Sequence, residues 1–338
     1  MTTKRNLSYT GMGMFHECPK KYDYHYNHKL RPIKEPAYFG FGRAVDVACN
    51  EILLGTKEGK AAAYAELDKL KADNIIFDAR DFDVELFDAK KYQDTLARVQ
   101  KIGYKGDDLE GLVTALLREE DLTENQQLAL AEACVESMKL KVDIIMKSFK
   151  DNIMPMVEEV EAVQLATKRG IIDFKAKLKG YGTVYVDNKT SSRPYEKDAV
   201  KWSTQLIGYG AERAMYIVFP KTMKKTRVKT CTKCGRDGSE GRHKTCNNTV
   251  DGVRCEGEWE IKTRASVEPQ ILVDDIPEES RALVESAYVE TEAAIETGVF
   301  PKNLKSCRQT FGYKVFECPY LHKCWHNSDY GLKKVGGK

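Results

Sequence analysis

Two strand-like stretches joined by a glycine-containing connector constrain the fold of this chain more than any other feature. Residues 171–178 and 183–189 are rich in Ile, Val, Phe and Tyr, and the connector between them reads Lys179-Gly180-Tyr181-Gly182. This pattern predicts a β-hairpin, because β-branched and aromatic residues favour extended backbone and glycine permits the tight turn. Residues at equal distances from Gly180 are therefore expected to meet.

Two aspartates are placed symmetrically about that turn. Asp173 and Asp187 each lie seven residues from Gly180, so folding the hairpin brings them opposite or next to each other. Side chains alternate along a strand, and Lys189 therefore projects from the same face as Asp187. Two carboxylates suit a hard ion such as Mg²⁺ or Mn²⁺, and the neighbouring lysine side chain can orient and deprotonate an attacking water. The pattern predicts a metal-dependent nuclease.

An Asp-x-Lys triplet is weak evidence for a nuclease when it occurs alone. Because 31% of the residues are charged, such a triplet is more often a solvated strand edge. Its context strengthens it, since residues 196–215 have the spacing of a helix, with Trp202 and Leu206 four positions apart. Gln205 and Tyr209 are also four apart and are expected to share one face of that helix.

Five segments occur in a characteristic order along the chain. They are Cys18-Pro19-Lys20-Lys21-Tyr22, Gly170-Ile171-Ile172-Asp173, Asp187-x-Lys189-Thr190, Gln205-x-x-x-Tyr209, and Phe300-Pro301-Lys302-Asn303 followed by Cys307, Cys318-Pro319-Tyr320 and Cys324. In this order and spacing they resemble the PD-(D/E)XK nuclease superfamily, in the RecB-like branch that includes the AddB nuclease domain and the CRISPR-associated exonucleases. The resemblance frames nearly the whole chain, with residues 50–150 and 221–264 as additions.

The resemblance implies a role for each matching polar residue. Asp173 and Asp187 would be metal ligands and Lys189 the catalytic lysine, while Gln205 and Tyr209 would support the substrate or the active site. The family usually places a metal-binding histidine a few residues after a glycine near the N-terminal helix.

This chain has an aspartate where that histidine is expected. Gly42-Arg43-Ala44-Val45 leads to Asp46, whose carboxylate suits Mg²⁺ or Mn²⁺ better than an imidazole does. The family also offers an upstream glutamate. Glu159 and Glu161 both qualify, on a strand expected to face the hairpin, with Glu159 the preferred candidate and surface charge the alternative.

The ten cysteines are the second informative feature of the sequence. Whether they form disulfides or bind metal depends on the compartment of the protein. The N-terminal residues lack the apolar core of a secretory signal, and no run approaches the ~20 apolar residues of a membrane span. A reducing compartment is expected, namely the cytoplasm of a bacterial or phage-infected cell. There, cysteines more often bind metal or fill the core than form disulfides. Cys49 and Cys134 have apolar helical neighbours and are expected to be buried.

Four cysteines in residues 221–264 predict a zinc ribbon. Cys231 and Cys234 have knuckle spacing, and Cys246 and Cys255 could close a tetrahedral Zn²⁺ site. The eight residues between the second pair imply a longer hairpin that turns at Asp251-Gly252. His243 is the substitute ligand if one of the cysteines is free.

The same segment concentrates basic charge. It holds 12 Lys and Arg against 6 Asp and Glu, whereas the net charge of the whole chain is +3. The cations alternate well enough for a two-stranded arm that follows a phosphate backbone, and the alternative is a solvated hairpin stem held by zinc. The candidate DNA-binding residues are Lys224, Lys225, Arg227 and Lys229, with Lys221 before them.

Four further cysteines lie near the two ends of the chain. Many RecB-like nucleases hold a four-iron four-sulfur cluster on one N-terminal and three C-terminal cysteines, and the resemblance assigns that role to Cys18, Cys307, Cys318 and Cys324. The ten residues between Cys307 and Cys318 depart from the tight family spacing. His322 as a replacement ligand and zinc in place of the cluster remain alternatives.

The fold expected from these features is an α/β, PD-(D/E)XK restriction-endonuclease-like core, with a central mixed sheet flanked by helices. The predicted parts are the N-terminal portion of the nuclease domain (1–50), a helical insertion (51–150), the nuclease core (151–220), the zinc-ribbon arm (221–264) and a C-terminal portion with the cysteine cluster (265–338). A strand is predicted at residues 270–273, and Pro277 begins a helix predicted to end at Gly298.

The expected activity is Mg²⁺- or Mn²⁺-dependent hydrolysis of DNA, more from single-stranded ends than elsewhere, in recombination, repair or phage DNA processing. Two alternatives stay open. The chain could be a DNA-binding module whose nuclease site has decayed, or a nuclease subunit that acts with a recombination, repair or CRISPR adaptation partner. No interaction with a membrane is expected.

Overall fold

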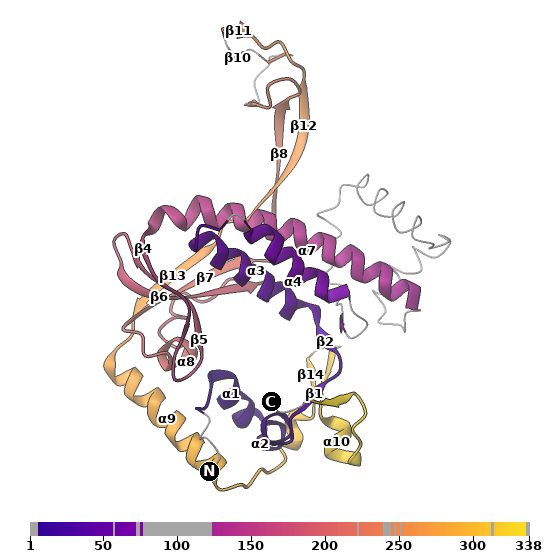
Figure 1. The fold of residues 1–338 in the computed structure, drawn as a ribbon, viewed down its shortest axis with the longest axis vertical. Coiled ribbons are helices and arrows are strands. Elements are labelled where there is room, and N and C mark those ends of the chain that lie inside the picture. The colour runs from indigo at the N-terminus through magenta and orange to yellow at the C-terminus, as the bar shows by residue number, and fades with distance from the viewer. Residues whose placement is uncertain are drawn as a thin grey trace.

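The computed structural model of the protein describes residues 6–56, 58–71, 75–76, 124–221, 223–238, 245–246, 248–250, 252–311 and 314–335. His243 and part of the predicted helical insertion lie outside these ranges. Figure 1 shows a body built around one sheet and an arm that projects from the body, on the side away from both chain termini.

A five-stranded mixed sheet forms the centre of the body, in the order β13-β7-β6-β5-β4. Its neighbours are antiparallel except β6 and β7, which run parallel. The strands are β4 (Val157–Ala166), β5 (Ile171–Leu178), β6 (Gly182–Ser191), β7 (Arg213–Pro220) and β13 (Gln270–Asp275). The predicted hairpin is confirmed as β5 and β6, and Gly180 and Gly182 both adopt the left-handed backbone that its turn requires.

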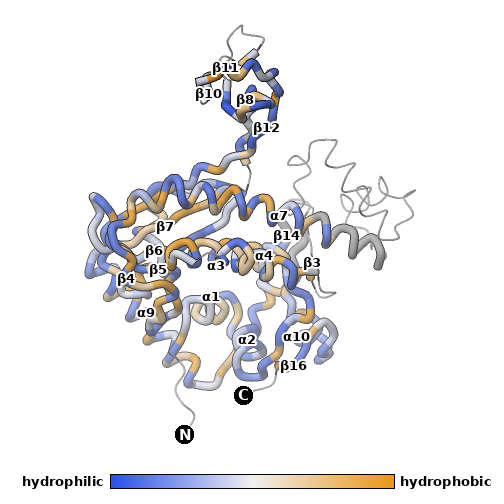
Figure 2. Tube along the Cα trace, turned by 45° about the horizontal axis from the view of Figure 1, so that its top comes forward, coloured by the Kyte–Doolittle hydropathy of each residue, from blue (hydrophilic) through white to orange (hydrophobic). Residues whose placement is uncertain are grey.

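Helices cover both faces of this sheet. One face packs against α3 (Ala37–Leu53), α4 (Gly59–Asp68) and α7 (Glu124–Asn152), and the other against α1 (Tyr9–Glu17), α8 (Thr204–Gly208) and α9 (Glu278–Glu296). Alternation along β5 explains the first interface, because Phe174, Ala176 and Leu178 all enter the core that α3 and α7 cover. Figure 2 shows hydrophobic residues gathered along β7 and α3.

The described parts of the predicted helical insertion belong to this core. α7 contributes Val142, Ile145 and Phe149, each fully buried against the sheet side of the molecule. Cys49 in α3 and Cys134 in α7 are also fully buried, as expected for small apolar side chains.

The helix predicted over residues 196–215 is wrong in its extent. Turns occupy the region before α8, which spans only Thr204–Gly208, and residues from Arg213 onward form β7. Gly210 adopts a left-handed backbone with φ of 80° and ends the helical turn. The strand at residues 270–273 and the helix after Pro277 are confirmed by β13 and α9.

The arm is a long two-stranded ribbon with a small cysteine-bearing tip. β8 (Lys224–Cys231) pairs with β12 (Trp259–Ser266) along its whole length, and β9 (Asp237–Gly238) joins β8 as a third strand. At the tip, β10 (Thr249–Val250) and β11 (Val253–Arg254) form the expected hairpin, whose turn contains Gly252 with φ of 80°.

The two ends of the chain lie together below the sheet. β1 (Leu30–Pro32) pairs with β16 (Leu332–Lys334), so the N-terminal and C-terminal segments share a small sheet. Around it lie α2 (Pro19–Tyr22), a π-helical turn η1 (Asp23–Asn27) and α10 (Leu321–His326). The remaining elements are β2 (Glu35–Pro36), β3 (Ile75–Ile76), η2 (Lys69–Lys71), η4 (Met154–Met156), η5 (Leu304–Ser306), β14 (Arg308–Phe311) and β15 (Lys314–Glu317).

No helix among the described residues combines the length and the apolar character that crossing a bilayer requires.

Candidate active site and cysteine centres

Asp173 and Asp187 meet where β5 and β6 separate. The paired residues of the two strands end at Phe174 and Val186, and the aspartates are the next residue on each strand. Beyond this point the backbone N–H of Asn188 donates to Asp173 Oδ2 at 2.7 Å, so a carboxylate takes the place of a strand carbonyl. The symmetric placement about Gly180 thus brings the two acids together, as predicted.

A third acid reaches this point from α3. Burial and the charges of Asp173 and Asp187 raise the pKa of Asp46 to about 8. Burial and the charge of Asp187 raise the pKa of Asp173 to about 7, although the Asn188 N–H and Lys189 oppose this shift. The effect of one carboxylate's charge on another falls off with distance, so the three acids lie near one another. Asp46, on α3, therefore lies near enough to Asp173 and Asp187 for their charges to act on its carboxyl group.

Lys189 lies beside Asp187 on the same face of β6. Its Nζ is 2.6 Å from Asp187 Oδ2, and Asp187 is only 3% exposed. Burial acts to lower the pKa of Lys189, but the charge and hydrogen bond of Asp187 outweigh it and raise the pKa above its ordinary value. Lys189 is therefore an ammonium at neutral pH.

Gln205 and Tyr209 hold Asp187 from the opposite side. Gln205 Nε2 donates to Asp187 Oδ1 at 3.0 Å and to Tyr209 Oη at 2.8 Å, so the two side chains share one face as predicted. Tyr209 also packs against the backbone at Gly170, where a Cβ would lie 3.0 Å from its ring. The glycine that precedes Ile171 is thus required by this close approach.

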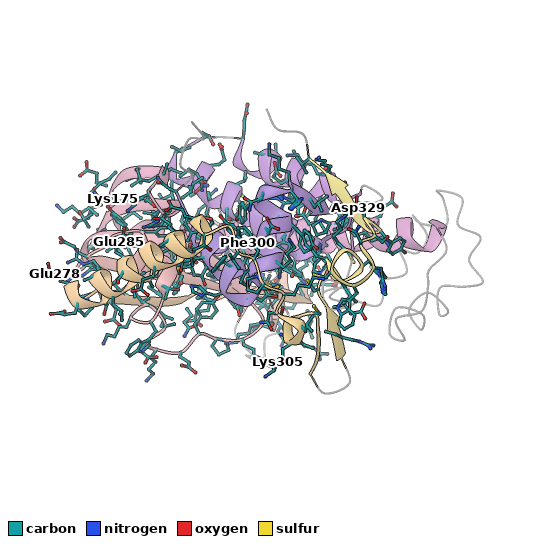
Figure 3. The ribbon with its side chains drawn as sticks, turned by 90° about the horizontal axis from the view of Figure 1, so that it is seen from below. Lys175, Glu278, Glu285, Phe300, Lys305 and Asp329 are labelled. Carbon is teal, nitrogen blue, oxygen red and sulfur yellow. The ribbon has the colours of Figure 1, made fainter. Side chains whose placement is uncertain are left out.

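Arg169 joins the site to α9, and no motif in the sequence indicates this role. The guanidinium is 1% exposed and forms ion pairs with Glu285 at 2.8 Å and with Glu292 at 2.5 Å. Its Cζ also lies 4.2 Å from the centroid of the Tyr288 ring. Figure 3 shows Glu285 on α9. Because Arg169 directly precedes Gly170, this clamp anchors the start of the strand that carries Asp173.

Glu159 is placed away from the other acids, which corrects the prediction. It is exposed and pairs with Lys177, four positions along β5 from Asp173. Glu161 is also directed elsewhere, with an ion pair to Lys175 of 2.7 Å and a hydrogen bond from Thr183. Two register shifts in β4 move these residues relative to β5, and such shifts are not visible in a residue pattern.

The arrangement of acids suits a divalent cation. Burial is the first cause of the raised pKa values of Asp46 and Asp173, and repulsion between the carboxylates adds to it. A hard cation would offset this repulsion and would find the oxygen donors that Mg²⁺ and Mn²⁺ prefer. Asp173 and Asp187, which meet at the end of the hairpin, therefore fit the metal expected from the sequence, although the ligand atoms of the three acids do not all lie within 4.8 Å of one another.

The arm brings Cys231, Cys234, Cys246 and Cys255 into one group. All four sulfurs lie within 4.8 Å of one another, with Cys231 and Cys255 at 3.5 Å and Cys234 and Cys246 at 3.7 Å. Zn–S bonds of about 2.3 Å to the corners of a tetrahedron place sulfurs about 3.8 Å apart. The backbone N–H of Arg236 lowers the pKa of Cys234 to about 6, which favours the thiolate that binds a metal.

The register of the arm separates its cations into two faces. Residues paired across β8 and β12 share a face, so Arg227 and Lys229 lie on one side with Ile261, and Lys224 lies on the other. On that other side Lys262 pairs with Glu260 and Arg264 pairs with Asp237. Within the described part of the chain, neither Arg227 nor Lys229 forms an ion pair.

The second cysteine group also assembles from both ends of the chain. Burial together with the charges of Cys307 and Cys18 raises the pKa of Cys318 to about 11, and the same neighbours act on Cys324. The backbone N–H of Cys318 donates to the carbonyl of Cys307 at 2.8 Å.

A hairpin explains the unusual gap between Cys307 and Cys318. The strands β14 and β15 fill it, and Arg308 pairs with Glu317, so the two cysteines return to each other at the base of the hairpin. His322, the alternative ligand, is exposed, whereas Cys324 on the same helix is buried.

The two groups differ in spacing. Among the described residues, the arm's group alone has all its ligand atoms within 4.8 Å of one another, so the sulfurs of the second group are spread more widely than one zinc ion requires.

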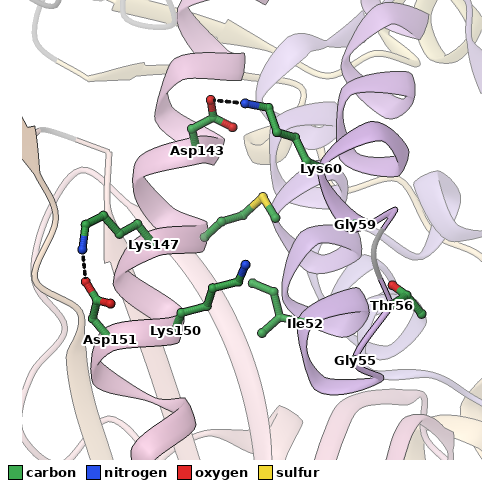
Figure 4. Close-up of a pocket in the computed structure, with 10 residues that line it drawn as sticks. Ile52, Gly55, Thr56, Gly59, Lys60, Asp143, Lys147, Lys150 and Asp151 are labelled. Carbon is green, nitrogen blue, oxygen red and sulfur yellow. Dashed lines mark hydrogen bonds and ion pairs between the residues drawn. The ribbon is translucent and has the colours of Figure 1, made fainter.

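A separate pocket of about 530 Å³ lies between the α3–α4 turn and α7. Figure 4 shows that two of its lysines are neutralised, Lys60 by Asp143 at 2.7 Å and Lys147 by Asp151. Asp46, Asp173 and Asp187 do not line this pocket.

Comparison with known proteins agrees with this geometry. No curated protein matches the chain. A profile of the PD-(D/E)XK nuclease superfamily matches residues 6–212, a range that includes Asp46, both aspartates of the hairpin, Lys189, Gln205 and Tyr209. Because this match covers more than half of the 338 residues, the chain belongs to the PD-(D/E)XK nuclease superfamily.

Proposed function

We propose that this protein is a Mg²⁺- or Mn²⁺-dependent deoxyribonuclease that cuts DNA from single-stranded ends. Membership of the superfamily implies a metal-dependent hydrolase of phosphodiester bonds. The observation that carries the proposal is that Asp173 and Asp187 meet at the end of the β5–β6 hairpin, with Lys189 Nζ 2.6 Å from Asp187 and with Asp46 of α3 near enough for their charges to act on it. Because Asp173, Asp187, Lys189 and Gln205 are all present, we favour a catalytically active site over one that has lost its activity.

The three carboxylates of Asp46, Asp173 and Asp187 would hold the metal ion. When bound, such an ion activates water and stabilises the negative charge that develops on the phosphate. Gln205 fixes the orientation of Asp187 through its Nε2 hydrogen bond, and Tyr209 fixes Gln205 in turn. This support matters because a metal ligand that can rotate binds its ion less tightly.

Lys189 supplies a positive charge at the same point. Its raised pKa keeps a proton on Nζ, so the side chain can donate hydrogen bonds to a water or to a phosphate oxygen. A metal ion held by Asp187 would offset the carboxylate charge that raises this pKa, so Lys189 could orient the attacking water and, as a free amine, accept its proton.

Two structural metal centres complete the proposal. The sulfur spacing in the arm supports Zn²⁺ at Cys231, Cys234, Cys246 and Cys255. The wider group of Cys18, Cys307, Cys318 and Cys324 supports a four-iron four-sulfur cluster, which is larger than a single ion and is held by four thiolates.

The arm supports DNA as the substrate. Its cations, Lys224, Lys225, Arg227 and Lys229, lie along β8, which projects from the body as a ribbon able to follow a phosphate backbone. We place this activity in recombination, repair or phage DNA processing, with a recombination, repair or CRISPR adaptation protein as the expected kind of partner.

The decisive variant is Asp187→Asn, which keeps the shape of a metal ligand and removes its charge. We expect cleavage of end-labelled linear DNA to fall on the order of 10²-fold or more in Mg²⁺ or Mn²⁺. Thermal unfolding should show that the variant remains folded. Closed circular DNA tests the mode of attack, since an exonuclease leaves it intact.

Glu159→Gln is the matched control, because it makes the same chemical change at an exposed acid of the same sheet. It should cut at the wild-type rate. Full activity of Asp187→Asn would remove the site assignment, and tight binding of DNA without cutting by the wild type would favour the binding module.

A further inference from the structure

An exposed aromatic pair lies on the helix that carries Asp46. Tyr38 and Phe39, in the first turn of α3, are 43% and 51% exposed, and their ring centroids are 4.5 Å apart. Single exposed aromatic residues are common, but two adjacent ones beside a buried polar site are typical of a binding surface.

Phe39 shares a helix face with Asp46. Positions 39, 42, 43 and 46 are separated by three, four and seven residues, so they line one side of α3, while Phe41, Ala44 and Val45 face the core. The surface at Gly42, between Phe39 and Asp46, is open, because a Cβ there would meet no described atom within 4 Å. Arg43, beside it, is exposed and adds positive charge, which Glu35 partly offsets at 2.6 Å.

Tyr38 connects this face to the strand that carries the catalytic lysine. Lys221 Nζ lies 5.2 Å from the centroid of the Tyr38 ring. The backbone N–H of Lys221 donates to the carbonyl of Ser191 at 2.7 Å, and Ser191 ends β6, two residues beyond Lys189. The aromatic pair is therefore bordered by cations and lies near the ends of β6 and β7, from which the arm departs.

We infer that Tyr38 and Phe39 form a stacking platform for the bases of single-stranded DNA next to the active site. Aromatic faces accept any unpaired base, and the cations nearby suit the phosphates of the same strand. In a duplex the base faces are already covered, so this platform favours a single strand. The inference rests on the proposed nuclease function for its substrate and names the groups that recognise it.

The geometry predicts where along the strand the stacked base lies. Seven residues of α-helix rise about 10 Å between Phe39 and Asp46. Stacked nucleotides advance about 3.4 Å each, so the platform lies within about three nucleotides of the phosphate that is cut.

The test measures binding of a fluorescently labelled single strand and of its duplex by the full chain, in an Asp187→Asn background. Phe39→Ala should weaken single-strand binding about 5- to 150-fold, as expected for the loss of one stacked base, and leave duplex binding nearly unchanged. Phe39→Trp keeps an aromatic ring at this position and should bind the single strand about as tightly as Phe39 does. Tyr330→Ala removes another exposed aromatic residue, 73% exposed near the C-terminus, and should change neither affinity.

A second measurement uses strands with one abasic position. Loss of the base should weaken binding most within about three nucleotides of the cut site of the wild type, and Phe39→Ala should abolish this dependence. Equal losses on single strand and duplex, a loss equal to that of Tyr330→Ala, or a lowered unfolding temperature with unchanged binding would overturn the inference. The comparison of single-strand with duplex binding needs no cleavage, so failure of the wild type to cut DNA would count against the nuclease proposal and leave the test of Phe39→Ala standing.

Discussion

At the scale of single residues, Arg169 shows how a buried charge can serve a site that it does not touch. Its guanidinium is enclosed by Glu285, Glu292 and the ring of Tyr288, all on α9. Tyr288 in turn packs against Gly208, where a Cβ would lie 2.9 Å from its ring, next to Tyr209. One cluster therefore holds both the strand that leads to Asp173 and the helix that presents Gln205.

We expect Arg169→Met to lower the free energy of unfolding by about 3 kcal/mol, near the lower end of the range for breaking a buried ion pair, because half-exposed Glu285 can be solvated. The pKa values of Glu285 and Glu292 are lowered in the folded protein, by the Arg169 hydrogen bonds against the opposing effect of burial. The stability that they contribute is present above their ordinary value of 4.5 and is lost as the pH falls through the lowered folded values.

Urea unfolding above and below pH 4.5 checks this prediction, and the difference between wild type and variant should shrink at the lower pH. Arg213→Met is the matched control, since Arg213 forms an exposed ion pair with Asp275 and such pairs contribute little. A difference that does not change with pH would show that packing, and not charge, accounts for the effect.

The sequence predicted these residues unevenly, for a physical reason. Asp173, Asp187 and Lys189 could be placed because a hairpin has one symmetric register and a two-residue alternation. Asp46 could be placed only through the family resemblance, since its contact with the others depends on tertiary packing. Glu159 was misplaced because the register shifts of β4 leave no mark in the residue pattern.

At the scale of elements, the same limit appears in residues 196–215. Met215 to Phe219 is a continuous apolar run, and periodicity alone does not distinguish a buried parallel strand from part of a buried helix. The run became β7 because it pairs with both β6 and β13 in the middle of the sheet. The β8–β12 arm was predictable because its glycine-containing turn and its cysteine spacing are local signals.

The two faces of the arm differ in how their cations are paired. Arg227 and Lys229 lie on the face where no ion pair is formed among the described residues, beside Ile261, which is 66% exposed. The opposite face carries Lys262 and Arg264, each neutralised by an acid. When unpaired lysines and arginines bind DNA phosphates, the counterions held by those phosphates are released. Residues already paired with an acid contribute less to this release.

We therefore expect the double change Arg227→Gln and Lys229→Gln to reduce the salt dependence of single-strand binding. The slope of log affinity against log salt concentration should fall by about 1.4, which corresponds to two lost phosphate contacts. Lys262→Gln with Arg264→Gln is the matched control on the other face and should leave the slope nearly unchanged. Equal effects from both pairs would show that the arm attracts DNA by its overall charge only.

At the scale of the whole molecule, the chain is closed on itself. β1 pairs with β16, and Cys18 from the N-terminal segment joins Cys307, Cys318 and Cys324 from the C-terminal segment. The α1 segment on one side of this junction and α9 on the other both pack against the sheet. A cluster that fixes the two ends would therefore hold both supports of the active site in place.

Cys324→Ala tests this closure, because it removes one ligand while changing little volume. We expect loss of iron and sulfide, a lower unfolding temperature and reduced cleavage, since metal binding at such a site contributes directly to folding. The full chain would be purified without oxygen, its metals measured and its absorbance spectrum recorded. Cys134→Ala is the matched control, since it removes an equally buried thiol from α7, outside both groups, and should leave the metal content unchanged.

The two metal centres can be separated in the same experiment. Cys234→Ser should lose the zinc of the arm and keep the iron, because its sulfur lies in the group whose spacing fits a single ion. If the wild type contained zinc and no iron, we would assign Cys18, Cys307, Cys318 and Cys324 to a second zinc site and not to an iron–sulfur cluster. If Cys324→Ala kept full stability and activity, the ends of the chain would be held by β1, β16 and the packing of Tyr24 on Tyr320 without any metal.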